Sequence, residues 1–507
     1  PDLTRNEKAH QGWGGAPITN EGAGGEVYNT IYYVAPSPHD SSTIWVGTDD
    51  GLVQLTRDGG KTWTNVTPKN VGPGFVNAIE VSPFDAGTAY LTYDGYKWSD
   101  WAPHIYRTTD YGRSWTPIVN GIRDGDQARV VRADPARKGL LFAGTETGAY
   151  VSFDDGAHWE SLQANLPPVP VTDLAVRHGD LVASTEGRAF WILDDVSPLE
   201  QGAEKVLASE TKLFAPRDAY LTEWGGGFGG GVAGANPPSG AIIYYDIAKG
   251  TDSTAVKLEI LDATNTVIRT LQSKPKPGET AIPGTPGLHR TSWDLRIEAL
   301  EAPKGMTFFG STKGYLVAPG RYSARLVVAG RSYTAPFTVK QDPRVTLTDA
   351  QVAEEQRVMR TIHRRMASIF RDAKRLDDVR DQVKAIVAHA SDLPKSDSVS
   401  TAGKQLAARL DSMSVLLVQP KHTNGQDIIN FPNGVVDQWA YLAGQVDGSY
   451  MPVTTGVTKR LGDLESQWSA VQARIDALLG PQVSAFNSLL GGKAVVIVPD
   501  GAGVPIT

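Results

Sequence analysis

The sequence contains no cysteine, which excludes disulfide bonds, thiolate catalysis and zinc sites built from cysteine. It has no run of about 18 apolar residues, so we expect no segment to cross a membrane as a helix. The patterns HExxH and GxSxG are absent, and the nine histidines show no paired metal-binding spacing. A net charge of −7 and a pI near 5.8 also disfavour binding to nucleic acid or to anionic lipid.

The 507 residues predict two to four domains. Tryptophan and glycine concentrate before about residue 241, whereas residues 346 to 479 are rich in Ala, Leu, Val, Arg and Asp. This contrast predicts a turn-rich β region followed by a helical region. The chain starts at Pro1, with neither an initiator Met nor a signal peptide. From this we expect either that an upstream segment has been removed or that the sequence is a fragment of a longer protein. The start fits an exported protein that is secreted, periplasmic or on the cell surface, and it fits a fragment equally well.

One short motif occurs three times, as TRDGGKTW at 56–63, TTDYGRSW at 108–115 and SFDDGAHW at 152–159. In the shared pattern Ser/Thr-x-Asp-x-Gly-x-Thr/Ser-Trp, the Asp carboxylate can accept N–H bonds across a turn and Gly supplies a positive φ. The Trp can fill the gap between neighbouring sheets. Only His158 departs from the pattern. We assign a structural role to Asp58, Gly60, Trp63, Asp110, Gly112, Trp115, Asp154, Gly156 and Trp159.

The motif resembles the Asp-box of the BNR-repeat β-propellers, a group that includes sialidases, xyloglucan-cleaving glycosidases and sortilin-type propellers. The resemblance covers about residues 28 to 195, where turn prolines recur at Pro38, Pro83 and Pro135. It implies a partial β-propeller of about four blades over residues 1–215, with the box as a structural turn. Because an open arc exposes sheet faces and edges, we expect an upstream fragment, another chain or a second copy to complete the propeller. A closed four-bladed ring is the less favoured alternative.

Two further segments follow the blades. The Gly-rich residues 216–240 are predicted to be a linker, because they lack the Lys-Ser/Thr ending of a phosphate loop. Residues 241–342 contain five alternating strands separated by Gly/Pro turns and predict a β-sandwich. The phrases GLHRTSWDLR at 287–296 and APGRY at 318–322 resemble the FlgD-like Ig module. That resemblance implies a spacer or docking domain.

After Pro343 the apolar residues recur every three or four positions, which predicts a four-helix bundle over residues 343–490. The four stretches are Met359 to Ile386, Leu406 to Leu417, Val435 to Val446 and Leu461 to Leu478. His363 is expected on the charged, solvated side of the first helix. Residues 491–507 are predicted to be a tail in which Ala494 to Val498 form a strand that adds to a sheet elsewhere.

A second row of turns carries an acid just before glycine. Because antiparallel strands alternate in direction, these turns should lie on the blade face opposite the Asp-boxes. The acids are Asp49, Asp50, Asp94, Glu146 and Glu186. Acids in tight turns ordinarily cap the backbone. The alternative is an acidic rim that meets a cationic peptide, a sugar or Ca²⁺; no other cofactor is expected.

The insertion from Tyr93 to His104 belongs to the same face and is rich in aromatic rings. Exposed large aromatic side chains often mark binding sites. Tyr96, Trp98, Trp101 and His104 are therefore our leading candidates for ligand contact. The alternative is that these rings cover the top of a blade or contact the helical bundle.

The sequence leaves two functional classes open. The favoured hypothesis is an exported scaffold that presents the propeller face to a protein, peptide or glycan, as part of a larger propeller or complex. The alternative is a glycoside hydrolase with paired Asp/Glu residues about 5–10 Å apart. No catalytic residue can be assigned, because the sequence gives no carboxylate separation and the spacing of Arg107, Arg129 and Arg132 selects none of them.

Overall fold

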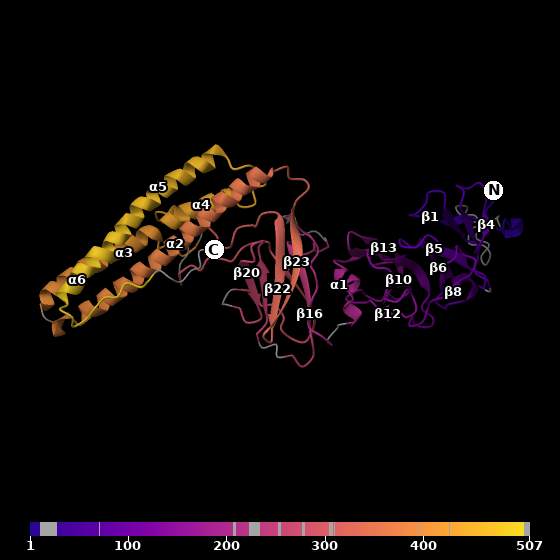
Figure 1. The fold of residues 1–507 in the computed structure, drawn as a ribbon, viewed down its shortest axis with the longest axis horizontal. Coiled ribbons are helices and arrows are strands. Elements are labelled where there is room, and N and C mark those ends of the chain that lie inside the picture. Colours follow the sequence, from indigo (N-terminus) through magenta and orange to yellow (C-terminus); the bar gives the residue numbers. More distant parts are fainter. Residues whose placement is uncertain are drawn as a thin grey trace. The chain divides into compact units, whose positions relative to one another are not determined.

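The computed structural model describes residues 1–10, 28–69, 71–205, 209–222, 234–251, 255–275, 279–303, 308, 310–393, 395–424 and 426–500. The chain divides into two compact units, Pro1–Phe214 and Ala215–Thr507 (Figure 1). Much of the predicted Gly-rich linker lies outside the described residues. Within the described part, no helix is long and apolar enough to cross a membrane.

The first unit contains four antiparallel sheets, in which strands adjacent in sequence are also adjacent in space. We call them blades 1 to 4. Blade 1 consists of β1 (Ile31–Pro36), β2 (Ile44–Thr48), β3 (Val53–Thr56) and β4 (Thr64–Asn65). Blade 2 consists of β5 (Phe75–Val81), β6 (Ala89–Asp94), β7 (Ile105–Thr108) and β8 (Thr116–Pro117). Blade 3 consists of β9 (Ala128–Ala133), β10 (Leu141–Thr145), β11 (Ala149–Ser152) and β12 (Glu160–Ser161). Blade 4 consists of β13 (Val171–Arg177), β14 (Asp180–Thr185) and β15 (Phe190–Leu193).

Short elements accompany the blades. They are the 3₁₀ turns η1 (Lys8–His10), η2 (Tyr96–Trp98) and η3 (Ala203–Lys205), the helix α1 (Ser197–Glu200) and the strand β16 (Lys212–Leu213).

Three hydrophobic clusters join consecutive blades. Between blades 1 and 2 the cluster includes Trp45, Leu55, Val76 and Ile79. Between blades 2 and 3 it includes Tyr90, Ile105, Val131 and Leu141. Between blades 3 and 4 it includes Phe142, Val151, Val171 and Leu174. The sheets therefore pack face against face in chain order, as propeller blades do.

The pairing register makes the blades directly comparable. In each blade the first two strands share the same irregularity near one end, so one residue of the second strand can be matched across all four. The matched residues are Gly47, Thr92, Gly144 and Ser184. A Cβ on Gly47 would lie 2.3 Å from Cγ1 of Val76, and one on Gly144 would lie 2.6 Å from Cγ1 of Val171. Small residues occupy this position because the first strand of the next blade packs directly against it.

The second unit begins with two sheets. The larger has the order β17-β23-β22-β19-β20, and in the smaller β18 pairs with β21. The strands are β17 (Ala219–Leu221), β18 (Ala241–Ile247), β19 (Lys257–Leu261), β20 (Val267–Gln272), β21 (Gly287–Trp293), β22 (Gly320–Val328) and β23 (Arg331–Gln341). The fully buried Trp293 of β21 lies 5.7 Å from the ring of Tyr322 and 6.1 Å from that of Phe337. These rings join the faces of the two sheets.

Helices make up most of the described residues after 343, as expected. They are α2 (Asp349–Ala388), α3 (Ser396–Leu417), α4 (Val435–Val446), α5 (Thr455–Ala477) and α6 (Val483–Leu489), with 3₁₀ turns η4 (Ala390–Asp392) and η5 (Asp427–Ile429). Thr348 begins α2 in a reciprocal capping box with Gln351. A π-helical segment, η6 (Leu478–Gln482), contains Pro481 and joins α5 to α6. One apolar core, including the fully buried Trp439, fills the space between the helices.

The prediction of a strand at Ala494 to Val498 was wrong, because this segment pairs with side chains instead of a sheet. Asn487 exchanges two hydrogen bonds with the backbone of Val496, at 2.7 and 2.9 Å. Gln382 does the same with Ile497, at 2.8 Å in both directions. A side-chain amide carries one donor group and one acceptor, as a strand edge does, so the extended backbone is satisfied on the helices.

We predict that Gly144→Val destabilises the first unit by about 1–3 kcal/mol, because the new side chain overlaps Val171 of the next blade. Ser184→Val is the matched control: it occupies the same position in blade 4, which no further blade follows among the described residues of the first unit. Thermal unfolding followed by circular dichroism measures both. Equal loss of stability in the two variants would refute the blade matching.

Candidate functional site

The three Asp-box turns are closed by their carboxylates. Asp58 accepts hydrogen bonds from the Thr62 amide at 2.9 Å, the Thr62 hydroxyl at 2.6 Å and the Thr56 hydroxyl at 2.8 Å. The bonds from Thr62 lower the pKa of Asp58 to about 2. Asp110 has the same partners in Ser114 and Thr108. These carboxylates are occupied in holding turns.

The one departure from the motif keeps the same chemistry. In the third box His158 donates its backbone amide to Asp154 at 2.8 Å, and its Nδ1 lies 2.7 Å from the same carboxylate. The imidazole therefore takes the place of the Thr62 and Ser114 hydroxyls.

The Trp and Gly of a box touch the preceding blade. Nε1 of Trp115 donates to the Val66 carbonyl at 2.7 Å, and Nε1 of Trp159 donates to the Ile118 carbonyl at 2.8 Å. A Cβ on Gly112 would lie 2.7 Å from Val66, and one on Gly156 would lie 2.5 Å from Ile118. In blade 1, Trp63 instead bonds the carbonyl of Gly60 within its own turn, at 3.2 Å. The Asp-boxes of blades 2 and 3 therefore contact the preceding blade. Within the described chain, the Asp-box of blade 1 makes no such contact.

The predicted acidic rim is largely engaged in local structure. Asp50 is buried and accepts from the Arg5 amide at 2.7 Å, Asn29 at 2.6 Å and Thr48 at 2.5 Å. Asp49 binds the amide and hydroxyl of Thr30. Asp94 is also buried and accepts from the Tyr96 amide at 3.0 Å, and burial raises the pKa of this carboxyl.

The surroundings of Glu146 and Glu186 differ from those of Asp49, Asp50 and Asp94. Glu146 forms an ion pair with Arg129. Glu186 is exposed on the β14–β15 turn.

The aromatic insertion is only partly exposed. Tyr96 is 38% exposed and makes an edge contact with Phe75, which also contacts Tyr32. Trp101 is 56% exposed, whereas Trp98 is half-buried. His104 lies 2.8 Å from Asp100 and stacks on Tyr106. Tyr96 and Trp101 are the rings that a ligand on this face can reach.

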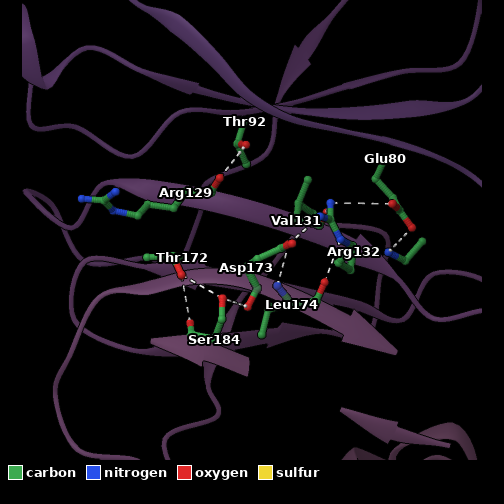
Figure 2. Close-up of polar contacts among 10 residues, drawn as sticks. Glu80, Thr92, Arg129, Val131, Arg132, Thr172, Asp173, Leu174 and Ser184 are labelled. Atoms are coloured by element: carbon green, nitrogen blue, oxygen red, sulfur yellow. Dashed lines mark hydrogen bonds and ion pairs between the residues drawn. The ribbon is translucent and has the colours of Figure 1, made fainter. Parts of the chain in front are cut away.

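Sequence reasoning missed a junction centred on Arg132 of β9 (Figure 2). Its guanidinium donates to Asp173 of blade 4 at 2.5 Å and to the Leu174 carbonyl at 2.9 Å. It lies 3.8 Å from Glu80 of blade 2 and 5.9 Å from the ring centroid of Tyr33 of blade 1. Burial raises the pKa of Glu80, and Arg132 opposes that shift. One arginine thus connects all four blades.

The signal for this junction was present but weak. Arg132 is a charged residue inside an otherwise apolar strand, and the matched residue of blade 2 is Glu80. Nothing in one sequence says that these two positions face each other.

Among the described residues, both outer faces of the blade array carry exposed apolar side chains. Ile31 and Val34 of β1 are 50% and 56% exposed, whereas their matched residues Val76 and Ile79 in blade 2 are 0% and 1% exposed. In blade 4, Phe190 and Ile192 of β15 are 75% and 58% exposed. We call the β1 surface the leading face and the β15 surface the trailing face. Both carry residues of the kind that the inner blade interfaces bury.

One histidine was wrongly placed by the sequence. His363 does not lie in solvent: its ring packs edge-on against Tyr315 at 5.6 Å, and burial lowers its pKa. Its neighbours come from a segment distant in sequence, which helical periodicity does not reveal. Among the described residues, no group of three His, Asp or Glu side chains could hold a metal ion.

Comparisons with known proteins leave the family open. No family model matches the chain, and no curated protein is similar to it in sequence. Among solved structures the chain is similar to YCF48 from Cyanidioschyzon merolae, at 18% identity over 33% of this chain and 53% of that one, with a TM-score of 0.26. It is also similar to YCF48 bound to D1 peptide, at 15% identity over 61% of this chain and 85% of that one, with a TM-score of 0.26.

A third similar structure is the GH74 xyloglucanase from Xanthomonas campestris, at 15% identity over 60% of this chain and 55% of that one, with a TM-score of 0.27. These proteins are β-propellers. The chain spans about half the length of the first and third of them, which it covers over 53% and 55%.

We predict that Arg132→Met destabilises the first unit by about 2–3 kcal/mol at neutral pH, because it removes the ion-pair partner of the largely buried Glu80 and leaves it with the weaker influence of Arg177. Loss of Arg132 should raise the pKa of Glu80 further in the folded state. A raised carboxyl pKa costs stability above the ordinary glutamate pKa, so the deficit should shrink as the pH falls from neutral.

Chemical unfolding measured between pH 4.5 and pH 7.5 tests this expectation. The double variant Glu80→Gln/Arg132→Met is the control, and it should show a smaller deficit without that pH dependence. A deficit that stays constant with pH would argue against a linked Glu80 titration.

Proposed function

We propose that the chain is a non-catalytic binding and assembly scaffold, in which a partial Asp-box propeller is completed by further blades outside this sequence. The observation that carries the proposal is the contrast between the exposed Ile31 and Val34 and the buried residues matched to them in the following blades. A sheet face rich in such residues is stabilised by a covering sheet.

The preceding blade would make the contacts that blade 1 lacks. Trp63 and Gly60 would contact that preceding blade in the way that Trp115 and Gly112 contact blade 1. A following blade would pass against Ser184 and cover Ile192. The leading and trailing faces differ. An added blade must therefore place its trailing face on blade 1 or its leading face on blade 4, as consecutive blades of this chain do.

The remaining parts of the proposal concern the other regions and the ligand. We assign the first unit to the sortilin-like Asp-box group, the paired sheets of the second unit to a FlgD-like Ig module and its helices to a bundle. The protein would be exported and would present Tyr96 and Trp101 to a protein, peptide or glycan.

The glycoside hydrolase alternative is weaker on this geometry. Hydrolysis needs one accessible carboxylic acid and a second carboxylate across a cleft. Asp50 and Asp94 are buried under local hydrogen bonds, and Glu146 is held by Arg129. Four of the five acids, all except the exposed Glu186, are better explained as turn and ion-pair partners.

We predict that the protein purified from its source is a complex with a blade-bearing polypeptide or with a second copy. Native mass spectrometry measures this. Val34→Asp and Ile192→Asp should dissociate the complex by placing charge on the leading and trailing faces, whereas Ile429→Asp, at an 81% exposed site in the second unit, should leave it intact. A lone wild-type monomer at cellular concentration would rule out blade completion.

We also predict that Trp101→Ala weakens ligand capture on peptide and glycan arrays by about tenfold or more without changing the melting temperature. Tyr220→Ala removes a ring of similar exposure in the second unit and is the control. If the two variants bind alike, the aromatic insertion is not the contact surface; turnover of a glycan would instead favour the hydrolase.

A further inference from the structure

A cavity of about 440 Å³ lies within the second unit, and the residues that line it all belong to that unit. Helices α2 and α4 form two of its walls, and the residues around Leu300 together with Gly310 to Tyr315 form the rest. Its volume falls in the range of small-molecule binding pockets.

The interior wall of the cavity is apolar. It is formed by the buried side chains of Leu300, Tyr315, Met359, Ile362 and Met366. Methionine is flexible and polarisable, so a wall with two methionines can adapt to an irregular hydrocarbon surface. His363 also lines the cavity, and its lowered pKa favours the neutral ring. The deep part of the cavity is therefore suited to an uncharged, apolar group.

Charged side chains lie at the cavity edge. Arg296 forms an ion pair with Asp447, which also accepts a hydrogen bond from the Leu316 amide at 2.9 Å. This pair joins the sheet region to α4 and leaves little net charge. Lys313 is exposed and makes no ion pair with any residue that the structure describes. The uncompensated charge of the lining is thus positive.

We propose that this cavity binds a small amphipathic anion, with its apolar body against Met359, Ile362 and Met366 and its carboxylate or similar head group near Lys313. The site is independent of the blades, so it stands whether or not the proposed scaffold function is correct. It would make the junction between the sheets and helices of the second unit responsive to a ligand, because a molecule bound there touches both.

The test uses dodecanoate as the probe, with dodecyltrimethylammonium as the probe of equal chain length and opposite charge. Isothermal titration calorimetry on the full chain, below the critical micelle concentration of either probe, should show saturable binding of dodecanoate and markedly weaker binding of the cation. Lys313→Glu should weaken dodecanoate binding by about three- to tenfold. Lys404→Glu reverses another exposed lysine, on α3, and should change nothing.

A second pair of variants tests the cavity itself. A Cβ added to Gly444 on α4 meets no atom within 4 Å, and Gly444 lines the cavity, so Gly444→Trp should obstruct it and abolish saturable binding. Gly462→Trp on α5 is also free of clashes and lies outside the cavity lining, so it controls for the substitution. Non-saturable binding, equal affinity for the two probes, or binding that survives Gly444→Trp would each overturn the proposal.

Discussion

Face-to-face burial of consecutive sheets is the constraint on which the first unit depends. A blade has two apolar faces and no core of its own, so each blade is stabilised by the blade on either side. One position in the second strand of blades 1, 2 and 3 is occupied by Trp45, Tyr90 and Phe142. Each of these buried residues places a large ring against the next blade. Gly47 and Gly144 then admit the next strand beside those rings.

Polar groups at the blade junctions follow from the same constraint. Close stacking brings the first strands together, where the largely buried Glu80 would be unfavourable without a cation. Arg132 supplies that charge and also donates to the Leu174 carbonyl. The Asp-box tryptophans act at another part of the blade, where Trp115 and Trp159 donate to backbone carbonyls of the preceding sheet. Apolar packing sets the spacing, and these bonds fix the register.

Local features of this chain could be predicted from its sequence, and features that depend on distant segments could not. The box turns follow from Asp, Gly and hydroxyl residues within five positions, and the long helix α2 follows from its apolar period. The junction at Arg132 needs four strands from four blades, so no local pattern encodes it. The tail at Ile497 and the ring of His363 were misjudged for the same reason, because their partners Gln382 and Tyr315 lie in segments distant in sequence.

The candidate site shows the same division. The sequence identified the acids in the turns opposite the Asp-boxes, but it could not say which of them bind other groups of the protein. Asp50 and Asp94 are buried and accept hydrogen bonds, while Glu186 is exposed. What a ligand can reach on this face is therefore mainly aromatic, in Tyr96 and Trp101. The exposed rings can contact a ligand, whereas Asp49, Asp50, Asp94 and Glu146 are engaged in turns or in an ion pair. These contacts favour the proposed recognition role over hydrolysis on this blade face.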